Sequence, residues 1–520
     1  MLKKHLRNKV ARKELLNLAK QAVIVEETQI KYKKILFCPL NGTTVNTYRE
    51  SILALGCEAR GASVEMLYLD SIFESSEFYK STSERLIYKF KVNKNISYCK
   101  KLGIPTVKSS NFNIEKRDKL QLTESNINEF NYNGILLGDL VLASSVRAHL
   151  CNSAEWHNPA FVDTINKVGA SAIKLAQLYD KILTQHQPDK LVMSHGMYVS
   201  WGVLFRLARK RGIDVVVYSS SYRKNSIRFY HNAPAAPFPL ADWGLYKDVP
   251  LNALENKLLD EYIKGREKQK DDNISLFDDR TVVPDHLKEF IEENKGKKIF
   301  CLFTNIAWDA FAFSKGNSFG DMIEWLDETI DFFKTRKDAA LIVKAHPAEE
   351  HFKTPVEYRV KSFIATKKLS ANIKFIKEDE EVKPFWLYDK IDFGLIHIST
   401  VAIEMALQGI PVLTSGANGH YSHNGFTVDP ESKKDYFNHI ENLIKQENYF
   451  VPDIKKAREY MFFRFFREAI EFDVIKLKNL STIEGLNIKN RKELLKGNNK
   501  TLDLICEGIL NNGKFITEYE

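Results

Sequence analysis

The chain has 520 residues, of which 44% are hydrophobic, 28% are charged and 12% are aromatic. This composition is that of a folded enzyme and excludes a disordered or fibrous protein, and the length exceeds what one hydrophobic core can hold. Lysine and arginine number 76 against 67 acidic residues, and the net charge of +9 suits anionic ligands without requiring nucleic acid.

The N-terminal segment 1–30 begins with a basic helical pattern. Its apolar residues lie on one face of the expected helix, with lysine and arginine residues around them. Two interpretations stay open: a packed or solvated surface helix, or a peripheral contact with anionic lipid headgroups. The apolar positions are Leu2, Leu6, Val10, Leu15 and Leu18.

Residues 31–250 form a first block of alternating strand and helix patterns. The first strand is followed by a small polar loop of Asn41, Gly42, Thr43 and Thr44, then by a helix and a second strand. Such alternation predicts a parallel sheet covered by helices, as in a Rossmann-like domain. The expected strands are 34–39, 63–69, 190–194 and 213–218, and the expected helices are 46–61, 159–185 and 198–211.

The rest of the chain repeats this organisation. Residues 71–135 are polar and irregular, and no element is assigned to them; residues 251–290 are interpreted as an interdomain connection. Residues 291–452 predict a second Rossmann-like domain, and residues 453–520 are expected to return to the first domain as helices. Their aromatic-rich stretch 461–467 predicts packed core. Expected strands are 298–303, 340–344, 373–376, 393–396 and 410–414, with helices at 320–337 and 401–408.

We therefore expect an α/β protein with two doubly wound, Rossmann-like domains facing a central cleft. In such folds the ligand binds outside the carboxyl ends of the parallel strands. Polar residues that directly follow a predicted strand are accordingly the candidates for a site.

The strongest local pattern is the stretch 397–412, in which a buried strand is followed by hydroxyl residues and a helix. Ser399 and Thr400 stand at the start of this helix, where N–H groups and the helix dipole favour a phosphate. Glu404 lies one turn further along, where its carboxylate could accept hydrogen bonds from ribose hydroxyls. The alternative is that Ser399 only caps the helix and Glu404 is solvated.

Two histidines follow predicted strands in the same way. His346 and Pro347 come after the strand at 340–344, and His195 comes after the strand at 190–194. An imidazole at a strand end can donate a hydrogen bond to a phosphate or a base, and its ordinary pKa would also let it act as an acid. Lys344 adds a cation beside His346. A purely structural histidine is the alternative at each position.

Several familiar sites are absent from the sequence. It contains no P-loop, no nucleophile elbow and no H-E-x-x-H pattern. Acidic pairs such as Asp271 and Asp272 lie in polar helical surroundings, so we expect no metal site. The basic residues form no aromatic-interleaved stripe, so we expect no nucleic-acid partner. The six cysteines include no C-x-x-C pair and no apolar run could span a membrane, so we expect a cytoplasmic protein.

These motifs together resemble the bacterial capsule polysaccharide biosynthesis proteins, which are GT-B glycosyltransferases that include the transferases using CMP-activated Kdo. The His-Pro and Ser-Thr elements are also similar to those of bacterial sialyltransferases and CDP-glycerol polymerases. These families share a cytidine nucleotide donor held by the C-terminal domain. The resemblance rests on residues 194–198, 303–309, 344–347, 399–404, 409–412 and 416–421.

The resemblance implies a donor site in the second domain and an acceptor site in the first. His346 would contact the donor phosphate or cytosine, and Ser399 and Thr400 would bind phosphate. No acidic triplet of the sialyltransferase type occurs in the first domain, so the general base stays open among three candidates, His195, Asp139 and Asp309, the last of which could equally cap its loop. The implied donor-binding residues are Lys344, His346, Pro347, Ser399, Thr400, Glu404 and Gly416.

The implied function is transfer of a sugar, Kdo-like or another nonulosonic acid, from a CMP-activated donor to a growing surface polysaccharide or glycolipid. No metal and no cofactor are expected, since the nucleotide sugar is itself the substrate. The basic N-terminal helix would allow contact with the inner face of the plasma membrane. The alternatives are a CDP-glycerol-type glycerophosphotransferase, a nucleotide-sugar 2-epimerase of the same two-domain shape, and a non-enzymatic scaffold.

Overall fold

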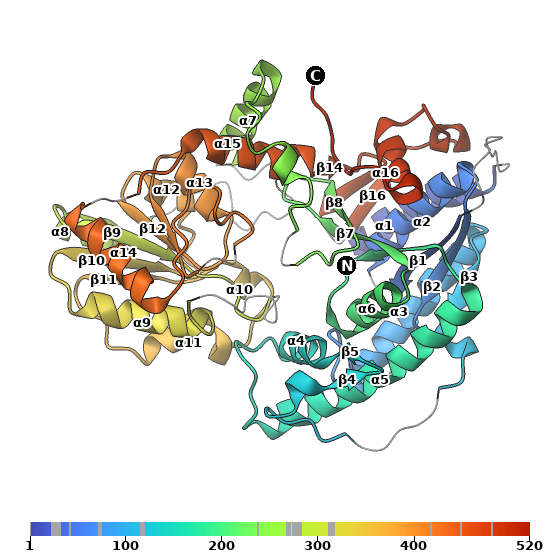
Figure 1. The fold of residues 1–520 in the computed structure, drawn as a ribbon, viewed down its shortest axis with the longest axis horizontal. Helices are drawn as coiled ribbons and strands as arrows, with labels where there is room; N and C mark the ends of the chain where they lie inside the picture. The colour runs from blue at the N-terminus through green and yellow to red at the C-terminus, as the bar shows by residue number, and fades with distance from the viewer. Residues whose placement is uncertain are drawn as a thin grey trace. The chain divides into compact units, whose positions relative to one another are not determined.

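Two α/β units, each with its own sheet, make up the chain (Figure 1). Unit 1 comprises residues 1–149, 155–239 and 465–518, and unit 2 comprises residues 150–154, 240–464 and 519–520. The computed structural model describes residues 2–21, 33–40, 43–70, 75–114, 120–236, 239–266, 272, 283–309, 318–416, 419–447, 450–479 and 482–520.

Unit 1 is built on a seven-stranded sheet in the order β14-β8-β7-β6-β1-β2-β3. The neighbours from β3 to β7 pair in parallel, whereas β8 is antiparallel to both β7 and β14. The central strands are apolar and fully buried, as expected when helices cover both faces. The strands are β1 (Lys34–Leu40), β2 (Ser63–Tyr68), β3 (Thr106–Lys108), β6 (Lys190–Ser194), β7 (Asp214–Ser220), β8 (Ser226–His231) and β14 (Ile470–Glu471).

Seven α-helices and two small hairpins of unit 1 lie within the described residues. Two helices of this unit were not expected from the sequence: α3, which lies in the stretch 71–135, and α4, which lies between that stretch and the helix expected at 159–185. The helix expected at 198–211 begins with a π-helical turn, Tyr198–Gly202. The helices are α1 (Leu2–Ala19), α2 (Thr44–Ala59), α3 (Thr82–Lys101), α4 (Gly138–His149), α5 (Pro159–His186), α6 (Val203–Lys210) and α16 (Lys500–Asn511), and the hairpins are β4 (Asn131–Tyr132) with β5 (Ile135–Leu136) and β15 (Ile475–Asn479) with β16 (Thr482–Leu486).

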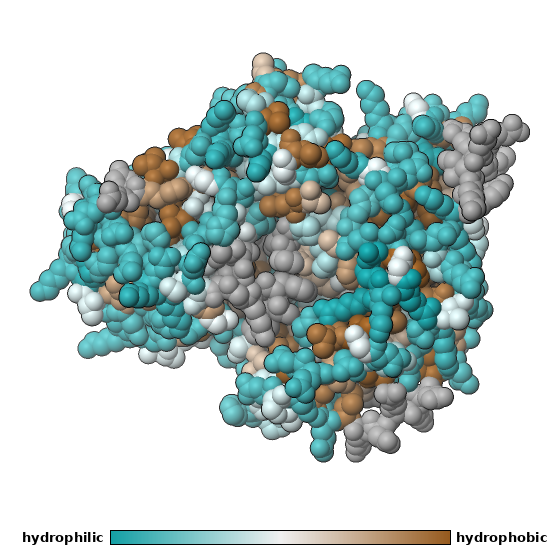
Figure 2. Space-filling view, viewed as in Figure 1, coloured by the Kyte–Doolittle hydropathy of each residue, from teal (hydrophilic) through white to brown (hydrophobic). Residues whose placement is uncertain are grey.

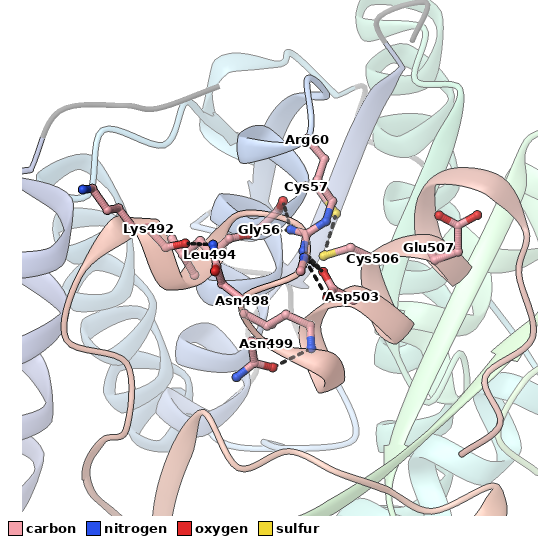
Figure 3. A network of polar contacts seen from close by, with 12 residues as sticks. Gly56, Cys57, Arg60, Lys492, Leu494, Asn498, Asn499, Asp503, Cys506 and Glu507 are labelled. Carbon is pink, nitrogen blue, oxygen red and sulfur yellow. Dashed lines mark hydrogen bonds and ion pairs between the residues drawn. The ribbon is translucent and has the colours of Figure 1, made fainter. Parts of the chain in front are cut away.

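The buried guanidinium of Arg60 connects the C-terminal segment to α2 through hydrogen bonds and an ion pair (Figure 3). Arg60, the C-cap residue of α2, donates hydrogen bonds to the carbonyl oxygens of Gly56, at 2.8 Å, and Leu494, at 2.7 Å. It also pairs with Asp503 of α16 at 2.5 Å. The thiols of Cys57 and Cys506 lie 4.0 Å apart beside this network. These contacts explain why residues 465–518 belong to unit 1.

The second half of α1 is packed. Leu15 and Leu18 are fully buried in the core of unit 1, and the Glu14 carboxylate accepts a hydrogen bond from the Leu486 N–H at 2.8 Å. Val10 is exposed. The structure therefore favours the packed surface helix for this half of α1, and the side chains before Val10, including Leu2 and Leu6, lie outside the described residues.

Unit 2 is built on a five-stranded, fully parallel sheet in the order β11-β10-β9-β12-β13. The expectation of two doubly wound α/β units is thus confirmed. The strands are β9 (Lys298–Phe303), β10 (Ala339–Lys344), β11 (Ile373–Ile376), β12 (Phe393–Ile396) and β13 (Val412–Thr414). The helices are α7 (Ala253–Arg266), α8 (Asp285–Glu293), α9 (Met322–Lys334), α10 (Ala348–His351), α11 (Val360–Ala365), α12 (Pro384–Tyr388), α13 (Val401–Leu407), α14 (Lys433–Lys445) and α15 (Ile454–Phe462).

Two further expectations can be compared with the structure. The aromatic stretch 461–467 is buried throughout, which confirms its interpretation as core. The stretch 251–290, expected to be a connection, contributes α7 and α8 to unit 2, and the last residue of α7 reaches the interior of that unit. All six cysteines are free and buried.

Polar and charged residues cover most of the face shown in Figure 2, and apolar residues appear there in small groups. No helix within the described ranges is long and apolar enough to cross a membrane.

Candidate functional site

The candidate site of unit 2 lies at the point where the strand order of its sheet reverses. From β9 the chain proceeds through β10 to β11 on one side, and then returns to β12 and β13 on the other. Loops that leave neighbouring strands in opposite directions at such a switch point leave room for a ligand at the carboxyl edge. The predicted residues His346, Ser399 and Gly416 all follow strands at this edge.

Thr304 and Asn305, which directly follow β9, connect these loops to each other. The Asn305 side chain accepts a hydrogen bond from the Ile398 N–H at 3.1 Å and donates one to the Ile398 carbonyl. The Thr304 hydroxyl accepts a hydrogen bond from the His346 N–H at 3.1 Å. From the sequence both residues were expected in a loop, and no role was assigned to them. The feature that could have identified them is their position directly after the central strand.

His346 is held as a neutral hydrogen-bond donor. Its Nδ1 atom accepts a hydrogen bond from the Ala348 N–H at 3.1 Å, so the proton of the neutral ring resides on Nε2. Burial, together with the charge of Lys344, lowers the pKa of His346 to about 4. This low pKa does not favour the imidazole as an acid near neutral pH, and the role stays a prediction. Pro347 follows it and directly precedes α10.

Lys344 is the last residue of β10, two positions before His346. Its side chain is buried, and burial lowers its pKa to about 8, with Cys301 and Glu380 opposing the shift. Contact of this amine with a donor, as the resemblance implies, would need the side chain to leave the interior. In the structure it affects the site through its charge on His346.

The hydroxyl residues stand where the sequence predicted them, at the start of α13. Thr400 occupies the N-cap position, but its hydroxyl makes no capping hydrogen bond. Ser399 Oγ accepts a long hydrogen bond of 3.4 Å from the Val401 N–H, and the Ser399 N–H donates to the Tyr421 hydroxyl at 3.2 Å. Both residues are half-buried, so each presents part of its side chain to solvent at this edge.

Glu404 is not placed as the resemblance implies. Its carboxylate is buried and accepts hydrogen bonds from Arg266 of α7 at 2.7 Å and from the Tyr388 hydroxyl at 2.8 Å. Arg266 also pairs with Asp272 at 2.9 Å. Since both carboxylate oxygens are engaged inside unit 2, a role in ribose binding is not supported. The residue instead joins α13 to α7 and α12.

This arrangement predicts that Glu404→Ala lowers the stability of the protein. Removing one of the two carboxylates that pair with the buried Arg266 leaves its charge compensated by Asp272 alone, which costs about 1–3 kcal/mol of unfolding free energy. Chemical denaturation monitored by fluorescence measures the loss. Asp309→Ala, a change at an exposed carboxylate, is the matched control and should leave stability unchanged. Equal denaturation curves for Glu404→Ala and the parent protein would contradict the assignment.

The last donor-site residue, Gly416, follows β13. Its N–H and carbonyl both contact the Thr414 hydroxyl, at 3.4 and 2.9 Å. The neighbouring Ser415 hydroxyl lies 2.7 Å from Nδ1 of His397, which is buried. This end of the edge is thus held by internal hydrogen bonds.

Unit 1 has a second cluster at its own switch point, between β1 and β6. His195 follows β6 and has a positive φ of 33°, as does Tyr198, with φ 58°. Such backbone conformations are costly for residues other than glycine and concentrate at functional sites. The His195 Nδ1 atom accepts a hydrogen bond from the Met197 N–H at 3.2 Å, repeating the arrangement of His346.

The structure argues against His195 as the general base. Burial, together with the charge of Arg147, lowers its pKa to about 3. The one ring nitrogen that lacks a proton already accepts a backbone hydrogen bond. A base with so low a pKa removes a proton from a hydroxyl poorly, so His195 is better suited to donate a hydrogen bond from Nε2.

The other predicted residues are placed as follows. Asp139, in the first turn of α4, forms a two-point ion pair with Arg206 at 2.5 and 2.7 Å. Asp309 is exposed at the end of the loop after β9. Thr43 caps α2 by accepting a hydrogen bond from the Asn46 N–H at 3.3 Å, and Thr44 is the first residue of that helix. Asn41 and Gly42 lie outside the described residues.

Sequence reasoning missed a buried carboxylate in unit 1, Glu77. Burial raises its pKa to about 7, against the opposing effects of hydrogen bonding to Ser200 and of the Arg147 charge. Arg147 also lies over the Tyr198 ring at 5.5 Å, and Tyr198 packs edge-on against His195 at 5.7 Å. Glu77 therefore belongs to the cluster around His195, although it stands in the stretch without a recognisable pattern.

The chain was compared with known proteins. No protein-family model and no curated protein sequence matches it. The KpsC β-Kdo 2,4 transferase of Thermosulfurimonas dismutans is 14% identical over 52% of this chain and 78% of its own, with a TM-score of 0.35. The UDP-GlcNAc 2-epimerase from Neisseria meningitidis is 10% identical over 83% and 98%, with a TM-score of 0.24. The epimerase from Methanocaldococcus jannaschii is 14% identical over 83% and 98%, with a TM-score of 0.28. At this level the likeness concerns the α/β fold alone, and the function has to be argued from the site.

Proposed function

We propose that the protein is a glycosyltransferase that takes a sugar from a nucleotide-activated donor, with the nucleotide bound by unit 2. The observation that carries this proposal is the hydrogen-bonded edge at the switch point of a parallel sheet. His346 follows β10, Ser399 and Thr400 follow β12, and both loops are hydrogen-bonded to the loop after β9. Nucleotides bind at this position in doubly wound sheets. The resemblance of the His-Pro and Ser-Thr motifs to cytidine-dependent families favours CMP as the nucleotide.

In this proposal the nucleotide phosphate is bound by neutral donors. The His346 Nε2–H and the Thr400 hydroxyl, which is not used to cap α13, would donate hydrogen bonds to phosphate oxygens. Donors fixed in place before the reaction stabilise charge that develops on the leaving phosphate without having to reorganise. Because the pKa of His346 is about 4 and that of Lys344 about 8, this contact should stay constant between about pH 5 and 7.

The transfer step has to move one proton. The acceptor hydroxyl oxygen forms a bond to the anomeric carbon, the bond from that carbon to the phosphate oxygen breaks, and the nucleoside monophosphate leaves with the bonding electrons. The hydroxyl proton passes to a base. We propose Glu77 for this role because it belongs to the cluster around His195 and, with a pKa of about 7, is available as a base at neutral pH. Its carboxylate is buried, so the acceptor hydroxyl reaches it only when the surrounding side chains move.

Nucleotide binding should be visible as thermal stabilisation of the full chain. A ligand at about 100 times its dissociation constant adds about 2.7 kcal/mol to the folding free energy, so CMP or CDP should raise the melting temperature measurably. UDP and GDP at the same concentration are the controls and should raise it less. A response to none of the four nucleotides contradicts the proposed function, and a response to UDP alone contradicts the cytidine preference.

A further inference from the structure

We propose that the outward face of α3 docks on the surface of an anionic lipid bilayer. Three large apolar side chains of this helix are open to solvent: Leu86 and Ile87 are 56% exposed and Phe90 is 74% exposed. Contiguous exposed apolar side chains on a protein surface mark an interaction site more often than chance. The inference concerns a surface of unit 1 and does not rest on the proposed function.

The three apolar residues form one continuous patch. Leu86 and Phe90 are four positions apart and Ile87 and Phe90 are three apart, so Leu86 and Ile87 both lie beside Phe90 on the helix surface. The opposite face of α3 is the one that packs on unit 1, where Val92 and Cys99 are buried in the core and Tyr88 stacks on Phe78 at 5.3 Å. The patch therefore points away from the unit that carries it.

The charges around the patch identify the kind of partner. The only acidic residue of the helix, Glu84, is engaged at its start, where its carboxylate accepts hydrogen bonds from the N–H groups of Lys80, at 3.0 Å, and Ser81, at 3.1 Å. Every other charged residue of α3 is basic. The exposed lysines of the helix are Lys89, Lys91, Lys94, Lys100 and Lys101.

This combination matches a membrane interface. Apolar side chains can enter the region between headgroups and acyl chains while long lysine side chains reach back to anionic headgroups. Each lysine near such a surface contributes about 1 kcal/mol, so the five together can outweigh the cost of orienting the protein. A second copy of the chain is disfavoured as the partner, because it would bring two lysine-rich faces together. The packed half of α1 presents no comparable surface, since Leu15 and Leu18 are buried.

The proposal is tested by sedimentation of the full chain with vesicles. We expect binding to vesicles of phosphatidylcholine and phosphatidylglycerol, at least tenfold weaker binding to phosphatidylcholine alone, and loss of binding at high salt. The variant Leu86→Ser/Ile87→Ser/Phe90→Ser should bind at least tenfold more weakly than the parent. Leu245→Ser, which changes an equally exposed leucine elsewhere, is the matched control and should bind as the parent does.

The triple variant changes only exposed side chains, so its melting temperature should equal that of the parent, which separates loss of docking from loss of folding. Equal binding of the parent and the triple variant overturns the proposal, as does the absence of binding to anionic vesicles. Concentration-dependent association of the parent that the triple variant abolishes would assign the patch to a second copy and would overturn it as well.

Discussion

His346→Ala should weaken nucleotide binding by about 10- to 100-fold while the protein stays folded. The expected loss corresponds to one hydrogen bond to a charged group, about 1.5–3 kcal/mol. The ring is half-buried at a strand end and its Nδ1 atom contacts only the backbone of Ala348, so its removal should have little effect on packing. Isothermal titration of CMP into the parent and the variant measures the change.

His351→Ala is the matched control for this prediction. His351 is the last residue of α10, the short helix that follows His346, and it packs edge-on against Phe352; the hydrogen bond that connects His346 to Thr304 does not involve it. This control should bind CMP as the parent does. Unchanged affinity in His346→Ala would remove the imidazole from the site, and an equal loss in His351→Ala would show that the effect is not specific to it.

Glu77→Gln should lower kcat by about 100- to 10,000-fold, the usual range for loss of a general base. In the parent, kcat should rise with pH through an apparent pKa of about 7, because the deprotonated carboxylate is the form that accepts the proton. The variant should lack this rise. Its affinity for CMP should stay the same, because Glu77 belongs to unit 1 and the nucleotide is assigned to unit 2.

The stability of the variants distinguishes a catalytic role of Glu77 from a structural one. Since burial raises the pKa of Glu77, the folded protein favours the protonated form, and the carboxylate costs stability as the pH rises from about 4.5 to about 7. Glutamine carries no charge, so Glu77→Gln should be at least as stable as the parent at pH 8. Asp139→Asn removes an ion pair with Arg206 and should keep the pH-dependent rise. If the rise of kcat with pH persists in Glu77→Gln and disappears in Asp139→Asn, the general base is Asp139 and the role of Glu77 is structural.

The sequence predicted the strands well because buried parallel strands are short apolar runs with clear ends. The strands at 190–194, 298–303, 373–376 and 393–396 have the bounds expected from hydrophobicity alone. The helix expected at 159–185 ends one residue later in the structure. The positions of His346 and Ser399 at strand ends follow from these strands.

The predictions that failed concern features that depend on contacts between segments distant in the sequence. The first half of α3 has apolar residues at helical spacing, but they face solvent and stand in a polar stretch, so no helix was expected there. The partners of Glu404 come from α7 and α12, which are far from it in sequence, and nothing local indicates that this carboxylate is buried. The pKa shifts of His195, His346 and Glu77 arise mainly from burial, which the sequence does not specify for single polar residues.

Hydrogen–deuterium exchange of the full chain with and without CMP tests the central claim most directly. If the nucleotide binds at the carboxyl edge of the unit 2 sheet, CMP should slow amide exchange in peptides that cover residues 345–351 and 397–402, and it should leave the peptides of β6 and α3 unchanged. Protection confined to unit 1, or CMP binding that leaves both unit 2 segments unprotected, would contradict the account.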